Sequence, residues 1–435
     1  MKVIHLNSKT ALKEHILKGE QTLYVGSKTS TVIPWDDYSL TKEKVIVDLS
    51  SMPCKMEMDD NHNLTIEGAV TWKEAKAFCQ SRGRKVMTSP TEELALCLSG
   101  VATSCTGERC FGHGTLRDQI IELEYINHLG EEGLLSSTKK IDCQFSSLSQ
   151  YQADYKTYQG FKNAPFPRLE NEIDLMVGTE GQLGVVTKAV FKTVSASNEI
   201  YLFIKLPKWE INYEAHLEVY EKVQKLRDLV ESVELIDENS ISYLPQEERP
   251  CAGHDLIFLE LSSLNLEKVY EELISKFKNI SEDQVFEMSA SACREFRMNV
   301  PRYIFEQNQK MGVTKMGTDV QAQKDKFKDL LDIYRSWTEL GLEYNLFGHF
   351  GDAHLHFNFM PKKEQVDECQ RILSDFYHEV KKMHASPFAE HGIGIIKQKF
   401  IKNFYNEKHI ATFNFLKEKY DPTNKFFPSG YMSNL

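Results

Sequence analysis

Hydrophobic and polar residues alternate along residues 354–359, and this alternation predicts a β-strand. Its apolar members are Leu355, Phe357 and Phe359, and the residues between them carry two imidazoles and an amide. Successive side chains of a strand point to opposite faces. We therefore expect one apolar face and one polar face, from which side chains can bind a ligand at fixed positions.

Short hydrophobic runs separated by turn formers predict a strand-rich first part, up to about residue 195. The predicted strands are Thr22–Gly26, Lys44–Leu49, Asn63–Ala69, Gln119–Ile126 and Gly184–Val194. A helix is predicted over Trp72–Ser81. Residues 136–171 are polar and rich in Tyr, Ser, Pro and Lys, which predicts a long irregular excursion over the surface.

Strand and helix patterns alternate after Asn198. An amphipathic pattern predicts a helix over Glu214–Glu231, with Val219, Val223, Leu226 and Val230 on one face. The other predicted strands are Tyr201–Leu206, Val233–Ile236, Asp255–Leu261, Gln284–Met288, Leu342–Phe347 and His354–Met360. The other predicted helices are Leu266–Phe277, Gln321–Leu340 and Lys363–His384. This alternation predicts a sheet with helices on one face.

Length and composition indicate a soluble protein of two domains. A chain of 435 residues exceeds one ordinary core, and 41% hydrophobic with 26% charged residues is typical of globular proteins. The net charge of −11 argues against a general nucleic-acid or anionic-membrane surface. The N-terminus lacks the apolar core of a signal peptide, no apolar run is long enough to span a membrane, and the nine cysteines form no CxxC pair. These features predict a cytoplasmic location with reduced thiols.

Two segments of the first part are rich in glycine and hydroxyl residues, at positions 101–118 and 177–187. Glycines allow backbone N–H groups to approach an anion closely. Neither segment has the strand–GxGxxG–helix context of a Rossmann unit, and no Walker A sequence is present. Taken singly, such loops are more often turns than ligand cradles.

Metal-ligand chemistry is concentrated in the second part. The sequence GHFGDAHLHFN, at residues 348–358, holds three imidazoles and a carboxylate. Glu390 and His391 follow later, just before Gly392 and Gly394. Two histidines and a glutamate are a common ligand set for a borderline metal, and an adjacent histidine could serve as a base. A single histidine in a strand, by contrast, is usually a satisfied polar residue.

The order and spacing of these four blocks resemble the FAD-linked oxidases of the vanillyl-alcohol-oxidase/PCMH superfamily. Within it, the chain is similar to the glycolate, D-lactate and D-2-hydroxyglutarate dehydrogenase group. The resemblance implies an α+β fold. A PCMH-type FAD-binding domain of two subdomains would cover residues 1–195. A cap domain with an antiparallel sheet and flanking helices would cover residues 196–435, and its final segment would pack back on the FAD domain.

The resemblance also assigns roles to residues. Non-covalently bound FAD would contact Ser104, Thr106, Gly107, Gly112, Gly114, Thr115, Asp118, Gly178, Gly181 and Gly184. A divalent metal, zinc or manganese, would be bound by His349, His356 and Glu390. His391 would be the catalytic base. The substrate would be bound by Arg297, Lys315 and Asn358.

The chain departs from the family pattern in three places, one of which is Leu98-Ser99-Gly100, where the family has paired glycines. The family usually has a glycine-rich pyrophosphate loop after its first strand, and the equivalent here, VGSKTS at residues 25–30, has one glycine, although Lys28 and the hydroxyls could compensate. Ala353 and His354 stand where relatives often carry Gly-Asn. The additional imidazole could alter the choice of metal or the contacts to substrate.

The activity implied is FAD- and divalent-metal-dependent oxidation of a D-2-hydroxy acid, of lactate, glycolate or 2-hydroxyglutarate type, to the 2-oxo acid. Electrons would pass to a quinone, a cytochrome or an electron-transfer flavoprotein. No nucleic-acid partner is expected, while peripheral membrane contact and a homodimer stay open. The alternatives are a flavin oxidoreductase for another alcohol, a non-redox ether-lipid synthase, and a non-catalytic subunit that has lost FAD. The His/Glu set and two cations directed at a carboxylate favour the hydroxy-acid dehydrogenase.

Overall fold

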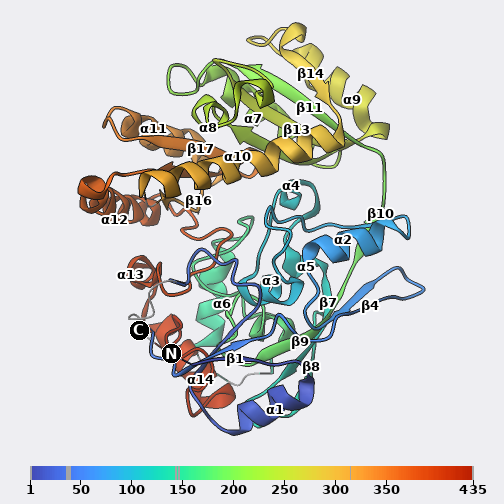
Figure 1. The fold of residues 1–435 in the computed structure, drawn as a ribbon, viewed down its shortest axis with the longest axis vertical. Helices are drawn as coiled ribbons and strands as arrows, with labels where there is room; N and C mark the ends of the chain where they lie inside the picture. The colour runs from blue at the N-terminus through green and yellow to red at the C-terminus, as the bar shows by residue number, and fades with distance from the viewer. Residues whose placement is uncertain (1, 36–40, 143–144, 146, 314, 434–435) are drawn as a thin grey trace. The chain divides into compact units, whose positions relative to one another are not determined.

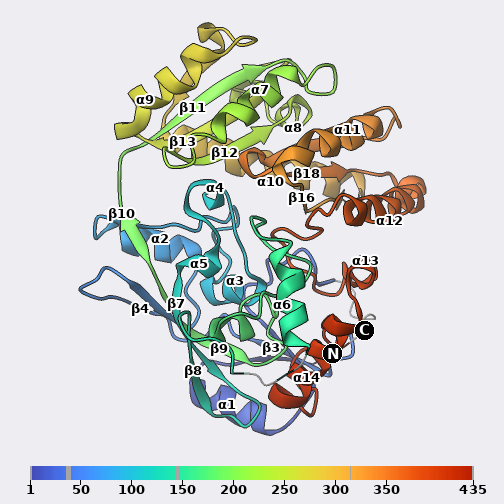
Figure 2. The ribbon, with the colours of Figure 1, turned by 180° about the vertical axis from the view of Figure 1, so that it is seen from behind.

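The computed structural model describes residues 2–35, 41–142, 145, 147–313 and 315–433, and the chain forms two compact units. The first unit contains residues 1–107, 114–196 and 388–435. The second contains residues 108–113 and 197–387. Figure 1 and Figure 2 show the ribbon from two opposite sides. The chain therefore returns to the first unit at Phe388.

Two main sheets build the first unit. A parallel sheet has the order β1-β3-β2, formed by Lys2–His5, Val45–Asp48 and Thr22–Val25. An antiparallel sheet has the order β4-β5-β9-β7-β8, formed by Lys55–Met58, Leu64–Glu67, Val185–Phe191, Ile120–Ile126 and Glu132–Ser136. A separate pair joins β10 (Thr193–Ser195) to β6 (Arg84–Val86).

The last residues of the chain extend the parallel sheet. Thr22 forms a parallel bridge with Phe426, and the Phe427 N–H donates to the Thr22 carbonyl at 2.9 Å. Phe426 packs in a core with Leu12 of α1 (Lys9–Leu17), whereas Phe427 packs with Leu23. Because Val45 and Val47 of β3 belong to the cluster of Phe426 and Ile46 to that of Phe427, the two phenylalanines cover both faces of this sheet.

Short helices accompany these sheets in the first unit. The predicted helix at 72–81 is present as α2 (Trp72–Gln80), and it begins with a capping box in which Thr71 and Glu74 exchange hydrogen bonds. The others are α3 (Cys97–Thr103), α5 (Leu116–Gln119), α6 (Leu148–Lys156), α13 (Gln398–Ile401) and α14 (Glu407–Tyr420). The predicted irregular excursion thus contains a helix, while its residues 143, 144 and 146 lie outside the described residues.

One antiparallel sheet forms the centre of the second unit. Its order is β14-β11-β13-β12-β17-β18-β15, and β16 also pairs with β18. In chain order, strands β11 to β18 are Glu199–Leu206, Val230–Ile236, Asp255–Ser262, Val285–Met288, Met316–Gly317, Val320–Gln321, Tyr344–His349 and His354–Phe359. The helices are α4 (Cys110–His113), α7 (Glu214–Val223), α8 (Glu238–Ser242), α9 (Leu266–Glu272), α10 (Ala290–Met311), α11 (Phe327–Thr338) and α12 (Val366–Lys382).

Helices cover both faces of this sheet, so the prediction of helices on one face is wrong. On one face, the rings of Phe203 and Phe258 stack with their centroids 5.0 Å apart, and the ring centroid of Phe203 is 6.1 Å from that of Phe296 on α10. On the other face, Phe357 meets Trp337 of α11 at 5.1 Å. The strand register places His356 on the α10 face. Phe258 is the register partner of residue 234 on β12, and residue 236, two positions further, lies on the same face. Residue 236 pairs with residue 347 on β17, which in turn pairs with His356 on β18.

Two helix predictions need correction. The helix predicted over Glu214–Glu231 ends at Val223, and Val230 begins strand β12 instead of continuing the helical face. Helix α10, the longest in the described residues, was not predicted, because it carries Pro301 in its interior. No helix in the described part of the chain is long and apolar enough to cross a membrane.

Candidate functional site

Strands β17 and β18 bring three imidazoles together in the second unit. His349 is the register partner of His354, and His356 lies two residues further along β18. All three residues are buried, and one ligand nitrogen from each lies within 4.8 Å of the others. A side chain at Gly348 would meet the His356 ring at 3.0 Å, so glycine leaves room for this cluster.

Each imidazole is oriented by an oxygen atom. His349 Nδ1 lies 2.9 Å from a Glu234 carboxylate oxygen, and His354 Nε2 lies 3.0 Å from a carboxylate oxygen of Asp319. His356 Nδ1 lies 3.1 Å from the Thr318 carbonyl oxygen. An imidazole that donates from one nitrogen presents a lone pair at the other, and metal-binding histidines usually have such partners. The donor set therefore fits a divalent metal.

The three predicted substrate residues also lie in the second unit. The Asn358 amide donates to Asn345 Oδ1 at 2.8 Å and is buried. Lys315 is exposed, immediately before β15. Arg297, on α10, forms an ion pair with the buried Glu108 carboxylate. Of the three, only Asn358 lies on the same strand as His354 and His356. A substrate carboxylate that binds Arg297 would compete with Glu108.

The first predicted flavin segment begins where α3 ends. Ser104 takes the left-handed conformation that ends the helix, with φ of 52°, and its hydroxyl donates to Asn163 Oδ1 at 2.7 Å. Thr106 is buried, and its hydroxyl has no hydrogen-bond partner. A side chain at Gly107, where φ is +119°, would lie 2.3 Å from the Ser89 carbonyl oxygen. Glycine at 107 is therefore required by the local chain path alone.

The rest of this segment is divided between the two units. Gly112 is in α4 of the second unit, where an added Cβ would lie 2.6 Å from the Val230 carbonyl oxygen. Gly114, with φ of +77°, precedes Thr115 in the first unit. The Thr115 N–H and hydroxyl donate to one Asp118 carboxylate oxygen, at 3.1 and 2.7 Å. Asp118 thus stabilises the start of α5 whether or not a ligand is bound.

The second predicted flavin segment is a turn at residues 178–184 of the first unit. Gly178 and Gly181 have φ of +74° and +72°, and an added Cβ would meet nothing closer than 3.4 Å and 3.8 Å. Their requirement is therefore conformational. At Gly184 a Cβ would lie 2.9 Å from the Tyr125 ring, so this glycine is needed for packing.

These residues fit a dinucleotide. The buried Thr106 hydroxyl has no protein partner, as expected of a group that binds a ligand. Backbone turns that contain glycines with positive φ present N–H groups suited to phosphate oxygens. The loop after β2, at residues 25–30, is less favourable, because the Lys28 ammonium lies 3.1 Å from the Asp48 carboxylate.

Glu390 and His391 lie on a loop of the first unit, at residues 389–394, whose backbone is held by two side chains. The Asn163 amide donates to the Ala389 carbonyl at 2.8 Å. The Ile393 and Gly394 N–H groups donate to the Glu180 carboxylate at 2.6 Å and 3.0 Å. Sequence reasoning missed both Asn163 and Glu180 as supports of this loop.

Sequence reasoning also missed three residues at the histidine cluster. Asp319 and Glu234 orient imidazoles, and His354 belongs to the cluster itself. The alternation of residues 354–359 already placed His354 on the face of His356, and this signal could have identified it. Since Glu390 and His391 belong to the other unit, their part in a shared metal site stays a prediction.

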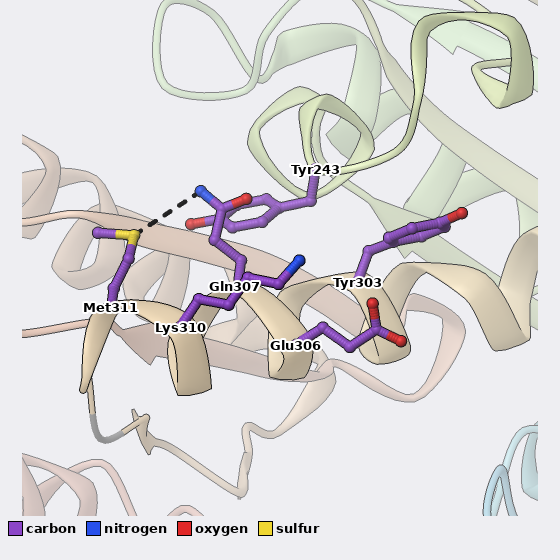
Figure 3. Close-up of a pocket in the computed structure, with 6 residues that line it drawn as sticks. All are labelled: Tyr243, Tyr303, Glu306, Gln307, Lys310 and Met311. Atoms are coloured by element: carbon purple, nitrogen blue, oxygen red, sulfur yellow. Dashed lines mark hydrogen bonds between the residues drawn. The ribbon is translucent and has the colours of Figure 1, made fainter.

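A separate cavity of about 320 Å³ lies at the surface of the second unit (Figure 3). Its lining residues are Tyr243, Tyr303, Glu306, Gln307, Lys310 and Met311. All but Tyr243 come from the second half of α10. None of the predicted site residues lines it.

Comparison with known families decides the classification. Residues 200–429 match the FAD linked oxidases, C-terminal domain, and residues 10–132 match an FAD binding domain. The chain belongs to the FAD-linked oxidases. The family resemblance predicted from the sequence is confirmed, as is the fold class, a PCMH-type FAD-binding fold followed by a domain with an antiparallel sheet. The FAD-binding domain supports FAD as the cofactor of this FAD-linked oxidase.

Relatives of this FAD-linked oxidase carry the names of dehydrogenases. A D-lactate dehydrogenase [cytochrome] of Kluyveromyces lactis is 21% identical over 400 residues, covering 87% of this chain and 64% of the relative. A D-2-hydroxyglutarate dehydrogenase of Arabidopsis thaliana is 23% identical over 279 residues, covering 60% of this chain and 49% of the relative. The chain thus spans less than two thirds of the length of these relatives.

A solved structure extends the likeness to nearly the whole chain. An alkyldihydroxyacetonephosphate synthase superposes with a TM-score of 0.68, covering 98% of this chain and 75% of the synthase. The identity is 12%, so this likeness shows the fold alone.

Proposed function

We propose that this FAD-linked oxidase is an FAD- and divalent-metal-dependent dehydrogenase that converts a D-2-hydroxy acid to the 2-oxo acid. The observation that carries the proposal is the cluster of His349, His354 and His356, with each ring oriented by an oxygen atom. Relatives named as D-lactate and D-2-hydroxyglutarate dehydrogenases support the substrate class. Lactate, glycolate and 2-hydroxyglutarate are the first substrates to test.

In this proposal the two units divide the work. The first unit binds FAD through the two glycine segments, except for residues 108–113 of the first segment, which belong to the second unit. The first unit also supplies the loop at residues 389–394. The second unit supplies the histidine face and the substrate residues. His349, His356 and Glu390 hold the divalent metal, zinc or manganese. The assignment agrees with the matched regions, because most of the FAD binding domain falls in the first unit and most of the oxidase domain in the second.

Oxidation of a hydroxy acid removes a hydroxyl proton and a hydride from one carbon. FAD supplies the hydride acceptor, which side chains cannot provide, and the divalent metal lowers the pKa of the hydroxyl proton. His391 takes that proton, because an imidazole titrates near neutral pH and this one adjoins a metal ligand in sequence. The loop contacts of Asn163 and Glu180 fix the backbone from which His391 acts.

Recognition of the substrate carboxylate falls to Arg297 and Lys315, with Asn358 beside the histidine face. An arginine can bind a carboxylate through two parallel hydrogen bonds, and a lysine adds a point charge. Because Arg297 is paired with Glu108, binding exchanges one carboxylate partner for another. Such an exchange favours acidic substrates over neutral alcohols, since a neutral alcohol cannot replace Glu108.

The electron acceptor in this proposal is a quinone, a cytochrome or an electron-transfer flavoprotein. A cytochrome acceptor is consistent with the name of the Kluyveromyces lactis relative, which contains the word cytochrome. The names of that relative and of the Arabidopsis enzyme also carry the word mitochondrial, so the cytoplasmic location stays a prediction.

Anaerobic reduction of the flavin tests the proposal. The purified protein is mixed with D- and L-2-hydroxy acids, and the flavin absorption bands are followed. We expect bleaching by at least one D-2-hydroxy acid and none by its L-enantiomer or by simple alcohols. Bleaching by neutral alcohols alone would favour the alternative of a flavin oxidoreductase with another substrate.

The same spectrum tests the alternative of a non-catalytic subunit. That alternative predicts no flavin bands in the purified protein and none after incubation with FAD. Flavin bands in the protein as purified would exclude it, in spite of the single glycine in the loop at residues 25–30.

A further inference from the structure

We propose that His354 is a third imidazole ligand of the metal site in this chain, and that the site therefore prefers zinc or cobalt to manganese. The inference rests on the proposed function, since that function places a divalent metal beside His349 and His356. It goes further by adding a ligand and a metal preference.

The position of His354 supports direct ligation. His354 is fully buried, with a relative exposure of 0%, and lies opposite His349 in the β17–β18 register. Its ring centroid is 5.3 Å from that of His349 and 4.7 Å from that of His356. The three rings therefore surround one small volume on a rigid, paired part of the sheet.

The orientation of the rings supports the same conclusion. Asp319 faces His354 Nε2 at 3.0 Å, and the preceding residue, Thr318, faces His356 Nδ1 at 3.1 Å through its carbonyl oxygen. Two consecutive residues thus orient two rings. With its Nε2 proton donated to Asp319, His354 carries its lone pair on Nδ1.

Distance and charge are compatible with one ion. The ligand nitrogens lie within 4.8 Å of one another. In a tetrahedral site, nitrogens that are each about 2.1 Å from the ion are about 3.4 Å apart, so binding needs each pair to approach by at most about 1.4 Å. The carboxylates of Glu234 and Asp319 are buried behind two of the rings, and a divalent cation would balance their two charges.

The third imidazole determines the metal preference. Imidazole nitrogen suits zinc and related late transition metals, whereas manganese is better served by carboxylate, carbonyl and water oxygens. Replacing an amide or water oxygen by the His354 nitrogen therefore strengthens zinc and cobalt binding more than manganese binding.

Metal titration of three proteins tests this inference. The full chain, His354→Asn and His354→Gln are stripped with a chelator and titrated with zinc, cobalt or manganese, each alone. For both variants we expect the Kd for zinc to rise roughly 10- to 100-fold, with a smaller change for manganese. The visible absorption of bound cobalt should change in position and intensity, because one nitrogen ligand is lost.

His378→Asn is the matched control, since His378 is exposed on α12, and its metal binding should equal that of the unchanged protein. Flavin absorbance and thermal unfolding verify that each variant folds, and two substitutions guard against the failure of one. Unchanged zinc affinity and an unchanged cobalt spectrum in both His354 variants would overturn the inference alone. Absence of a stoichiometric divalent ion in the unchanged protein would overturn the metal site of the proposed function as well.

Discussion

The β17–β18 hairpin of the second unit and the loop at residues 389–394 of the first unit both carry predicted site residues, and they are held by opposite means. On the hairpin, the backbone is fixed by strand pairing, and oxygen atoms of Glu234, Asp319 and Thr318 orient individual rings. On the loop, the Asn163 and Glu180 side chains hold the backbone itself.

This difference predicts different consequences of damage. Removing a support from the hairpin changes the orientation of a metal-binding nitrogen, so metal affinity should fall first. Removing a support from the loop shifts the whole segment that carries Glu390 and His391, so turnover should fall first. The following variants test that distinction.

The largest effect is expected at the loop itself. His391→Ala removes the proposed base and should lower turnover by about 10²- to 10⁴-fold, the usual contribution of general base catalysis. Flavin and metal content should stay unchanged, and His378→Ala on α12 is the control. Turnover within a few-fold of the unchanged protein would refute the role of His391 as base.

On the hairpin, Asp319→Asn and Glu234→Gln should each lower zinc affinity by roughly 10- to 100-fold, because oriented carboxylate partners strengthen metal-binding imidazoles. Glu248→Gln, which alters an exposed carboxylate hydrogen-bonded to Asn299, is a suitable control. Zinc affinity is measured by competition with a coloured chelator. If Asp319→Asn and Glu234→Gln bind zinc as tightly as the control variant and the unchanged protein do, the oxygen contacts do not support metal binding.

On the loop, Glu180→Gln replaces charge-assisted acceptors of two N–H groups by a weaker amide. Turnover should fall by roughly 10- to 100-fold, because misplacing a catalytic group by about 1 Å can cost that much. Zinc affinity should change less than turnover. Equal losses in both would remove the distinction between loop and hairpin.

The smallest effect concerns a buried carboxylate near the end of β12 that has no imidazole partner. Burial first, and then the neighbouring Asp255 carboxylate, raise the pKa of Asp237 to about 8. The folded state therefore retains a proton that the unfolded chain releases near pH 4, so this group lowers stability as pH rises from about 4 to 8.

Asp237→Asn should remove that contribution, so the fall in melting temperature between pH 5.5 and pH 8.5 should be smaller than in the unchanged protein. Thermal unfolding followed by circular dichroism at the two pH values measures the difference. The same fall in both proteins would exclude Asp237 as its source.

The sequence predicted the hairpin well because its structure is encoded locally. Strict alternation over residues 354–359 defines β18, and Phe357 and Phe359 both pack on Trp337, as one shared face requires. The supports of the site were not predicted, because they come from distant parts of the chain. Asp319 is 35 residues from His354, and Glu180 is 213 residues from Ile393. No local pattern encodes such contacts.

Helix α10 shows how one residue can hide a strong pattern. Its buried residues Cys293, Phe296, Val300 and Ile304 have helical spacing, but Pro301 lies among them and argues against a helix. Packing of that face against Phe203 and Phe258 of the sheet outweighs the cost of the proline. Arg297 consequently projects from a helix, beside Glu108.

The rate of anaerobic flavin reduction by a D-2-hydroxy acid, measured in stopped flow with and without divalent metal, tests the central claim most directly. We predict rapid bleaching of the flavin in the metal-loaded protein. Bleaching should be at least about tenfold slower after chelation and should recover when zinc is added back, because the metal lowers the pKa of the hydroxyl proton. Equal rates before and after removal of the metal, or a protein that binds no flavin, would contradict the account.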